Sequence, residues 1–145
     1  MVSFGYDTPV ITLDGTPLEV VPTFVYLGSS IFGDFITSSE EVECRIGKTS
    51  GIFARRKECV CKRRNVSLKT KMKIYDAIVI TTLLYASEFW TLLSTDLMKL
   101  EVFQMSCLHQ ILEVTRHDQL WNDTIRHRCM DQPTVGKRIQ WNPLR

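Results

Sequence analysis

The sequence predicts an α+β fold that is mainly α, with β-hairpins at the N-terminus and a bundle of three helices after them. Short runs of β-branched and aromatic residues before residue 30 flank a turn signal, Asp14-Gly15. Beyond residue 37, apolar residues recur at intervals of three and four in three long segments. With 44% hydrophobic residues, a chain of 145 residues can bury one core.

The N-terminal segments are typical of strands. Residues 10–13 (VITL) precede Asp14-Gly15, a pair that readily takes the positive φ angles of a tight hairpin turn. Residues 18–21 (LEVV) are the expected return strand, and residues 23–29 (TFVYLGS) predict a further strand with apolar side chains on both faces. Because two hairpins are marginally stable alone, this region is expected to be the tail of a larger domain.

The first helix is expected over residues 38–64. Ser38 and Glu41 fit a capping box at its start, and Arg64-Asn65 ends it. One side is expected to face the core, with Val42, Ile46, Thr49, Phe53 and Val60. The opposite side is expected to be almost purely cationic, with Arg45, Lys48, Arg55, Arg56, Lys62 and Arg63.

The second helix, expected over residues 67–90, is the centre of the predicted core. Ser67 is a suitable N-cap, and the chain is apolar nearly all round from residue 77 to residue 86. A third helix is expected over residues 95–113, where Asp96 suits the positive end of the helix dipole. The three helices should bury Phe53, Tyr75, Val79, Leu83, Leu100, Phe103 and Ile111 in one core.

A fourth, shorter helix is expected from Asn122 to about Cys129, followed by an irregular tail. The chain is thus expected to divide into residues 1–36, 37–115 and 116–145. The first part is made of hairpins, the second of the three-helix bundle, and the third of the short helix and the tail.

Charge is unevenly distributed, although the net charge is only +2. Residues 1–43 carry seven acids and no Lys or Arg, whereas residues 44–73 carry eleven of the 18 basic residues and a single acid, Glu58. This asymmetry favours a negatively charged partner for the middle segment. Residues 1–10 lack the basic start and apolar core of a signal peptide, and the longest apolar run is too short to span a bilayer, so no membrane partner is expected.

The cationic side of the first helix and three lysines of the second predict a nucleic-acid-binding surface. Apart from Glu58, it lacks the interspersed Glu that solvated helices usually carry at i,i+4, and phosphates would relieve the repulsion between its like charges. The alternatives are an ordinary solvated surface and a membrane-surface role. The predicted nucleic-acid-binding residues are Arg45, Lys48, Arg55, Arg56, Lys62, Arg63, Lys69, Lys71 and Lys73.

No catalytic or metal-binding residues are predicted. The seven glycines never cluster into a phosphate-binding loop, and no Asp-Asp pair is present to hold two Mg²⁺ ions. Cys59 and Cys61 lack the two-residue gap usual in zinc sites, and Cys107 and His109 point apart on a helix. Five cysteines without regular spacing indicate reduced thiols in an intracellular protein.

Four blocks stand in a specific order: PLEVVPTFVYLGSSI, EVECRIGKTSGIF, NVSLKTKMKIYDAIVITTLLYASEFW and KLEVFQMSCLHQIL. Together they resemble the C-terminal half of LINE-type (non-LTR) retrotransposon reverse transcriptases, the endonuclease–reverse transcriptase proteins. The resemblance covers roughly residues 8–133. The sequence departs from the family pattern at Gly33-Asp34-Phe35, at Thr81-Thr82 and in the run from Tyr85 to Trp90, and residues 137–145 resemble the family's basic, Trp-containing helix only loosely. These departures indicate a drifting copy.

The resemblance implies a role for each part. Tyr26, Leu27 and Gly28 would belong to the palm-edge hairpin that grips the primer terminus. The helices from Ser38 to about Thr115 would form the thumb, which holds the template–primer duplex. The palm block with the paired catalytic aspartates would lie upstream of Met1. The chain alone is therefore expected to have no catalytic residue, no cofactor and no polymerase activity, whereas the parent polymerase would use Mg²⁺.

These features together predict a fragment of an RNA-directed DNA polymerase that contributes binding of RNA–DNA hybrid or duplex nucleic acid through phosphate contacts. Two alternatives stay open: a host-adopted module that binds nucleic acid or protein, and a non-functional relic of a retroelement. The resemblance implies an intracellular, nuclear location, although no targeting signal is present. The sequence does not indicate an oligomeric state.

Overall fold

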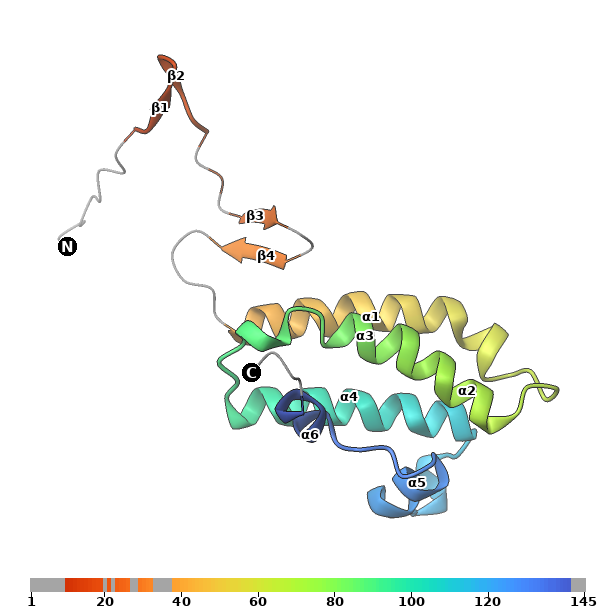
Figure 1. Cartoon of the computed structure of the whole chain (residues 1–145). Helices are drawn as coiled ribbons and strands as arrows, with labels where there is room; N and C mark the ends of the chain where they lie inside the picture. The colour runs from red at the N-terminus through yellow and green to blue at the C-terminus, as the bar shows by residue number, and fades with distance from the viewer. Residues whose placement is uncertain (1–9, 20, 22, 27–28, 33–37, 142–145) are drawn as a thin grey trace. The chain divides into compact units, whose positions relative to one another are not determined.

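The computed structural model describes residues 10–19, 21, 23–26, 29–32 and 38–141, and it separates the chain into two compact units, residues 1–36 and 37–145. The described part of the first unit consists of two β-hairpins, and the second unit is helical (Figure 1). The expected class, α+β and mainly α, is confirmed. Among the described residues, every helix is too short or too polar to cross a membrane.

The first hairpin pairs β1 (Thr12–Leu13) with β2 (Thr16–Pro17) in antiparallel register. Its turn residues, Asp14 and Gly15, have φ angles of 49° and 81°. These positive angles match the right-handed twist of the flanking strands, which is why Asp-Gly suits this turn. The predicted hairpin turn is therefore confirmed, but the expectation of a return strand over residues 18–21 is wrong, because the return strand pairs directly after the turn, at Thr16–Pro17.

The second hairpin pairs β3 (Thr23–Tyr26) with β4 (Ser29–Phe32), so that Tyr26 lies opposite Ser29. The expectation of one strand over residues 23–29 is therefore wrong. The apolar run was long enough for a single strand, but pairing of residues 29–32 with residues 23–26 satisfies the backbone hydrogen bonds of both segments locally.

The first two helices begin where the sequence indicated and end earlier. The first, α1 (Ser38–Val60), is followed by a turn. The second helix consists of α2 (Leu68–Tyr75), a π-helical segment η1 (Asp76–Ile80) and α3 (Thr81–Leu83). The hydroxyl of Ser67 accepts a hydrogen bond of 3.3 Å from the backbone N–H of Thr70, which confirms the predicted N-cap.

The expectation that the second helix continues to Trp90 is wrong. Ala86 adopts a left-handed conformation with φ 62°, and a 3₁₀ turn, η2 (Ser87–Phe89), follows it. The left-handed residue interrupts the helical hydrogen bonds and redirects the chain, so that Trp90 is buried in the core. The all-round apolar pattern predicted burial correctly but did not indicate where the helix stops.

Three further helices complete the second unit: α4 (Ser94–Leu112), α5 (Asn122–Arg128) and α6 (Val135–Gln140). A single 3₁₀ turn, η3 (Arg116–Asp118), lies between α4 and α5. Helices α4 and α5 confirm the expected third and fourth helices, but α6 corrects the expectation of an irregular tail. Thr134 caps α6 by accepting a hydrogen bond of 3.3 Å from the N–H of Lys137.

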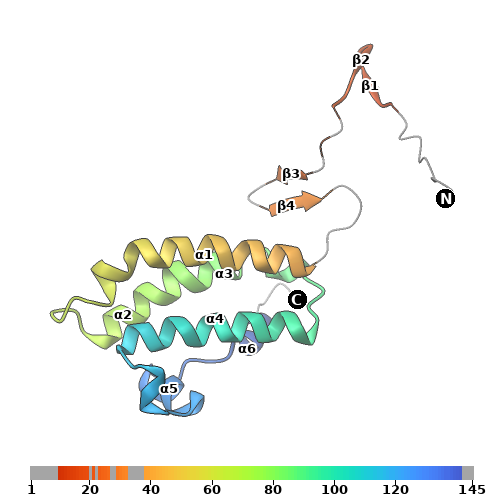
Figure 2. The same cartoon turned by 180° about the vertical axis from the view of Figure 1, so that it is seen from behind.

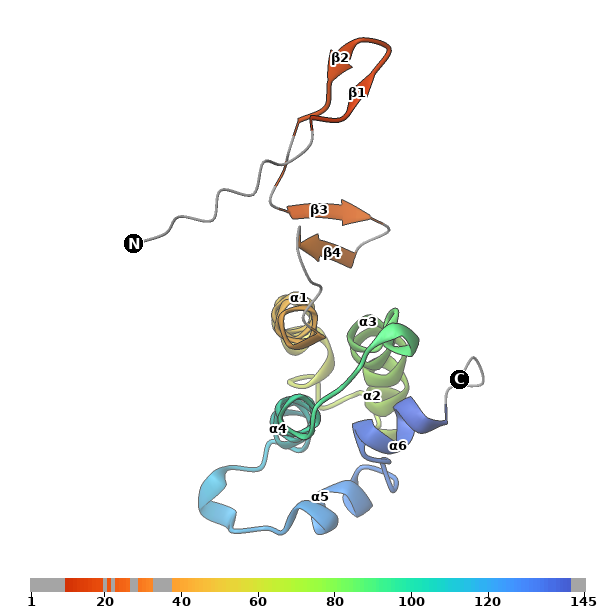
Figure 3. The same cartoon turned by 90° about the vertical axis from the view of Figure 1, so that its left-hand side faces the viewer.

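Helices α1 and α4 and the second helix lie side by side (Figures 1 and 2), and viewed along their axes they occupy the corners of a triangle (Figure 3). Two groups of buried side chains fill the space between them, one containing Phe53, Tyr75 and Ile111, the other Leu83. Six of the seven expected core residues are buried. The seventh, Phe103, is half-buried and packs against both groups.

Buried polar residues fix the helices relative to one another. Asp96 accepts hydrogen bonds from the hydroxyl of Ser39, at 2.8 Å, and from the N–H of Leu93, at 3.3 Å, so it joins the start of α1 to the start of α4. The amide nitrogen of Gln104 donates to the carbonyl oxygen of Pro133 at 2.9 Å, which ties the segment before α6 to α4. Helices α5 and α6 therefore belong to the same compact unit as the bundle.

Replacing Phe53 with Ala should lower the free energy of unfolding by about 3–5 kcal/mol, because Phe53 is 7% exposed and its removal leaves a cavity beside Tyr75. Chemical denaturation followed by circular dichroism measures this. Met98→Ala is the matched control, since Met98 is 68% exposed and its truncation should change stability by less than about 0.5 kcal/mol. Equal effects of the two substitutions would contradict the assignment of Phe53 to the core.

Candidate nucleic-acid interface

The end of α1 and the start of α2 lie together at one end of the helical bundle, joined by residues 61–67 (Figure 2). Lys71 fixes this junction: its Nζ donates a hydrogen bond of 2.7 Å to the carbonyl oxygen of Cys61. The last carbonyls of a helix lack partners within the helix, so a lysine from the next helix stabilises the chain where α1 ends. Cys61 is itself buried, which anchors the junction to the core.

Exposed cations gather at this junction from α1, from the connecting segment and from α2. We call this set the basic end: Arg55, Arg56, Lys62, Arg63, Arg64, Lys69 and Lys73. Lys57, in the last turn of α1, is half-buried beside it. In the segment from residue 55 to residue 73, Glu58 is the single acidic residue. The end of the bundle thus carries a high density of positive charge.

Glu58 neutralises only one of these cations. Its carboxylate lies 3.0 Å from the Nζ of Lys62, and both side chains are mainly exposed, at 78% and 64%. The hydrogen bond and the charge of Lys62 hold the pKa of Glu58 below its ordinary value, so Glu58 is ionised at neutral pH. Within the described residues, no ion pair holds Arg55, Arg63 or Lys69.

Arg45 does not belong to this surface, and the prediction that it does is wrong. Its side chain is buried, with Nε 2.9 Å from the carboxylate of Glu41 and the guanidinium 4.8 Å from the ring centroid of Tyr85. The reason is helical periodicity: Arg45 follows Val42 by three residues and precedes Thr49 by four, so it lies on the core-facing side. Arg45 therefore has a structural role.

Lys48 and Lys71 also depart from the expected continuous surface. Lys48 is exposed, but it precedes Arg55 by seven residues, which is roughly 10 Å along the helix axis. Lys71 is half-buried, and its ammonium group donates a hydrogen bond to the carbonyl oxygen of Cys61. Six of the nine predicted binding residues thus lie in the basic end, and Arg64 joins them although its sequence position suggested only a helix end. The cationic surface covers one end of α1 and not its whole length.

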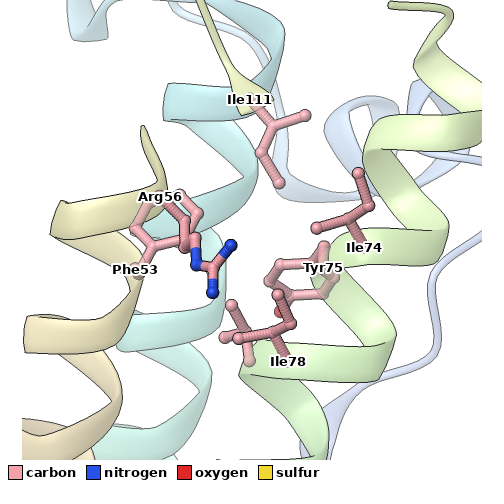
Figure 4. A pocket seen from close by; sticks show the side chains of 7 residues that line it. Phe53, Arg56, Ile74, Tyr75, Ile78 and Ile111 are labelled. Atoms are coloured by element: carbon pink, nitrogen blue, oxygen red, sulfur yellow. The ribbon is translucent and has the colours of Figure 1, made fainter. Parts of the chain in front are cut away.

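Arg56 lines a small apolar cavity as well as belonging to the basic end (Figure 4). The other labelled residues come from α1 (Phe53), from the second helix (Ile74, Tyr75 and Ile78) and from α4 (Ile111). Arg56 follows Phe53 by three residues, so its stem covers the core while the residue as a whole stays exposed. Apart from Arg56 the lining offers a ligand little polar contact, so the cavity is a packing gap.

The residues predicted to resemble a primer grip are only partly described. Tyr26 is the last residue of β3 and pairs with Ser29 across the hairpin. Leu27 and Gly28 lie outside the described residues.

The buried cysteines are poor nucleophiles. Burial raises the pKa of the Cys107 thiol to about 12 and that of Cys129 to about 11, and it raises the pKa of Cys61 as well. Because the thiolate is the reactive form, these three residues stay protonated and unreactive at neutral pH. In the described part of the chain, no three His, Cys, Asp or Glu side chains are grouped so that they could hold a metal ion.

Comparisons with protein-family models, with curated proteins and with solved structures found no match in any of the three. The functional assignment therefore rests on the residues themselves and on the resemblance of the sequence blocks.

Replacing Arg45 with Met should lower the free energy of unfolding by about 3–5 kcal/mol, because it removes the cation that pairs with the buried carboxylate of Glu41. Adding Glu41→Leu should restore most of the lost stability, since an apolar pair often replaces a buried ion pair without loss. Lys48→Met, on the exposed side of α1, is the control and should be nearly neutral. A neutral Arg45→Met variant would contradict the buried placement of Arg45.

Proposed function

We propose that this chain is the palm-edge and thumb part of a LINE-type reverse transcriptase, and that it holds the template–primer duplex through the basic end. The observation that carries the proposal is the gathering of exposed cations from three consecutive segments around a single acid. Phosphates of RNA–DNA hybrid or duplex nucleic acid are the partners that neutralise such a surface. The proposal assigns no catalytic residue to the chain.

The cations of the basic end repel one another. Lys69 and Lys73 are one helical turn apart, so like charge destabilises this pair. The arginines of the basic end add to the positive potential around it. A surface that only needed to be solvated could carry acids at i,i+4, as Glu58 and Lys62 do. Binding of phosphates removes the repulsion and releases counterions, which favours association.

A membrane-surface role is less well supported than nucleic-acid binding. A helix that lies on a bilayer must insert an apolar face, but the apolar side of α1 is already covered by its packing against α3, η1 and α4. The basic end could attract anionic lipids by charge alone. Among the described side chains of residues 55–73, no large apolar side chain is exposed to add the hydrophobic contribution that stable anchoring needs.

The long, flexible side chains of the basic end suit phosphate contacts and not base recognition. Arginines and lysines that contact phosphates position a protein on nucleic acid without reading its sequence. A thumb must move along its substrate, so weak dependence on sequence fits the proposed role. We therefore expect affinity to depend mainly on ionic strength.

A host-adopted binding module is the second candidate. It is favoured by the separation of residues 37–145 into a unit with its own core. In that case the basic end would bind nucleic acid or protein for another purpose. Reading the genomic sequence upstream of the codon for Met1 distinguishes the two: an adjoining palm with a paired-aspartate box supports the polymerase, and an independent promoter and splice structure supports adoption.

Replacing both Arg55 and Arg56 with Ala should weaken binding to RNA–DNA hybrid and to duplex DNA alike. The plot of log affinity against log salt concentration should become less steep, with the magnitude of its negative slope reduced by roughly 2, since two phosphate contacts are lost. The matched control removes the same charge elsewhere, with Lys48→Ala and Arg128→Ala at exposed positions outside the basic end. A salt titration by fluorescence anisotropy measures both variants. Equal slopes for the wild-type chain and the Arg55/Arg56 variant would refute the proposed interface.

Replacing Glu58 with Gln should strengthen binding of the hybrid by roughly two- to fivefold at an ionic strength of about 0.15 M, because it removes the single negative charge within the basic end. Glu40→Gln removes the same charge from the first turn of α1, roughly 27 Å away along the helix. That distance exceeds the Debye length of about 8 Å, so Glu40→Gln should leave affinity unchanged. Equal effects of the two substitutions would show that net charge, and not this surface, governs binding.

A further inference from the structure

A second surface, distinct from the basic end, lies between α5 and α6. The two helices and the segment between them form an open groove, lined by Arg126 and His127 of α5, by Thr134 and Lys137 at the start of α6, and by Trp141 at its end. This groove was not predicted from the sequence, because α6 was not predicted.

Trp141 presents its indole to this groove without being packed into the core. It is 83% exposed, whereas Val135 and Ile139 on the other side of α6 are buried. Trp141 follows Lys137 by four residues, so the indole and the ammonium group lie on the same outward side of the helix. An exposed aromatic ring beside a cation is the pair of groups that binds one unpaired nucleotide: the ring stacks on the base and the cation contacts the phosphate.

The charge of the groove is nearly balanced, unlike that of the basic end. Lys137 and Arg126 are opposed by Asp123 and Asp131, and Asp131 lies 2.7 Å from His127 Nδ1. Such a surface attracts the closely spaced phosphates of a duplex weakly. Its mixture of donors and acceptors suits the polar edge of a single base.

Hydrogen bonds also join α6 and the segment before it to the second helix, which carries part of the basic end. Arg138 donates a hydrogen bond of 2.8 Å to the carboxylate of Asp76, and the amide nitrogen of Gln132 donates to the same carboxylate at 3.5 Å. Asp76 follows Lys73 by three residues, in the next turn of the second helix. Figure 3 shows α6 beside this helix. A strand leaving the basic end along α2 would therefore reach α6.

We propose that the groove between α5 and α6 binds an unpaired nucleotide next to the duplex, with the base stacked on Trp141 and its phosphate on Lys137. This inference rests on the proposed function, because the basic end holds the duplex from which the unpaired strand would extend. The ligand class is single-stranded nucleic acid of any sequence, since every base has a face that can stack.

The test uses the full 145-residue chain and a single-stranded oligouridine of about eight nucleotides, within the range of sites used for such strands. Stacking of a base quenches indole fluorescence. The tryptophan fluorescence of the wild-type chain should fall when the oligouridine is added. The Trp141→Ala variant should not show this decrease and should bind the oligouridine roughly 5- to 150-fold more weakly. Trp141→Phe should retain much of the affinity, because a phenyl ring still stacks.

Trp121→Ala is the matched control. Trp121 is also 83% exposed but does not line the groove, so its removal should leave affinity and most of the quenching intact. Trp90 is buried and should not respond. Absence of quenching in the wild-type chain, or equal losses in the Trp121 and Trp141 variants, would overturn the proposal.

A second arm separates this inference from the proposed function. Binding of a blunt RNA–DNA hybrid should be unchanged in Trp141→Ala and weakened in the Arg55→Ala/Arg56→Ala variant. A hybrid with a single-stranded overhang should bind more tightly than the blunt one only when Trp141 is present. If the wild-type chain binds both hybrids equally tightly, the proposed nucleotide site in the groove is contradicted, but the proposed role of the basic end is not. If the Arg55/Arg56 variant binds the blunt hybrid as tightly as the wild type, the proposed role of the basic end is contradicted.

Discussion

Burial of the second helix against α1 and α4 is the constraint on which the rest of the helical unit depends. Val79 and Leu83 are almost fully covered, so this helix must lie between its neighbours. Since only residues 61–67 connect it to α1, the two helices run in opposite directions and the end of one meets the start of the other. Cations that are spread over almost twenty residues of sequence are thereby brought to a single end of the bundle.

Much of this fold could be predicted from local signals. Asp14-Gly15 specified a turn through its backbone preferences, and Ser67 specified a helix start through its hydroxyl. Helix α6 escaped prediction because six residues are too few to show a periodic pattern. Thr134 caps this helix, but the stability of α6 comes from packing of Val135 and Ile139 that only the tertiary structure provides.

The proposed binding surface was predictable in composition but not in extent. A count of cations identifies a basic segment. Whether each cation reaches solvent depends on its position around the helix and on its hydrogen-bond and ion-pair partners. Arg45 shows the difference: it has the residue type of a phosphate contact, but its spacing from Val42 and the nearby carboxylate of Glu41 place it in the interior. Lys71 does not contribute to the cationic surface for another reason: the backbone carbonyl of Cys61 accepts a hydrogen bond from its ammonium group.

Folding also redistributes the charge that the sequence carries. Away from the basic end, Glu43 pairs with Lys99 and Asp76 pairs with Arg138. These pairs hold the helices together and cancel positive charge at the same time. The small net charge of the chain therefore conceals a molecule that is close to neutral over much of its helical unit and strongly positive at one end. A phosphate backbone that approaches this unit is attracted to that end first, and the neutral groove beside α6 is left to interact through stacking.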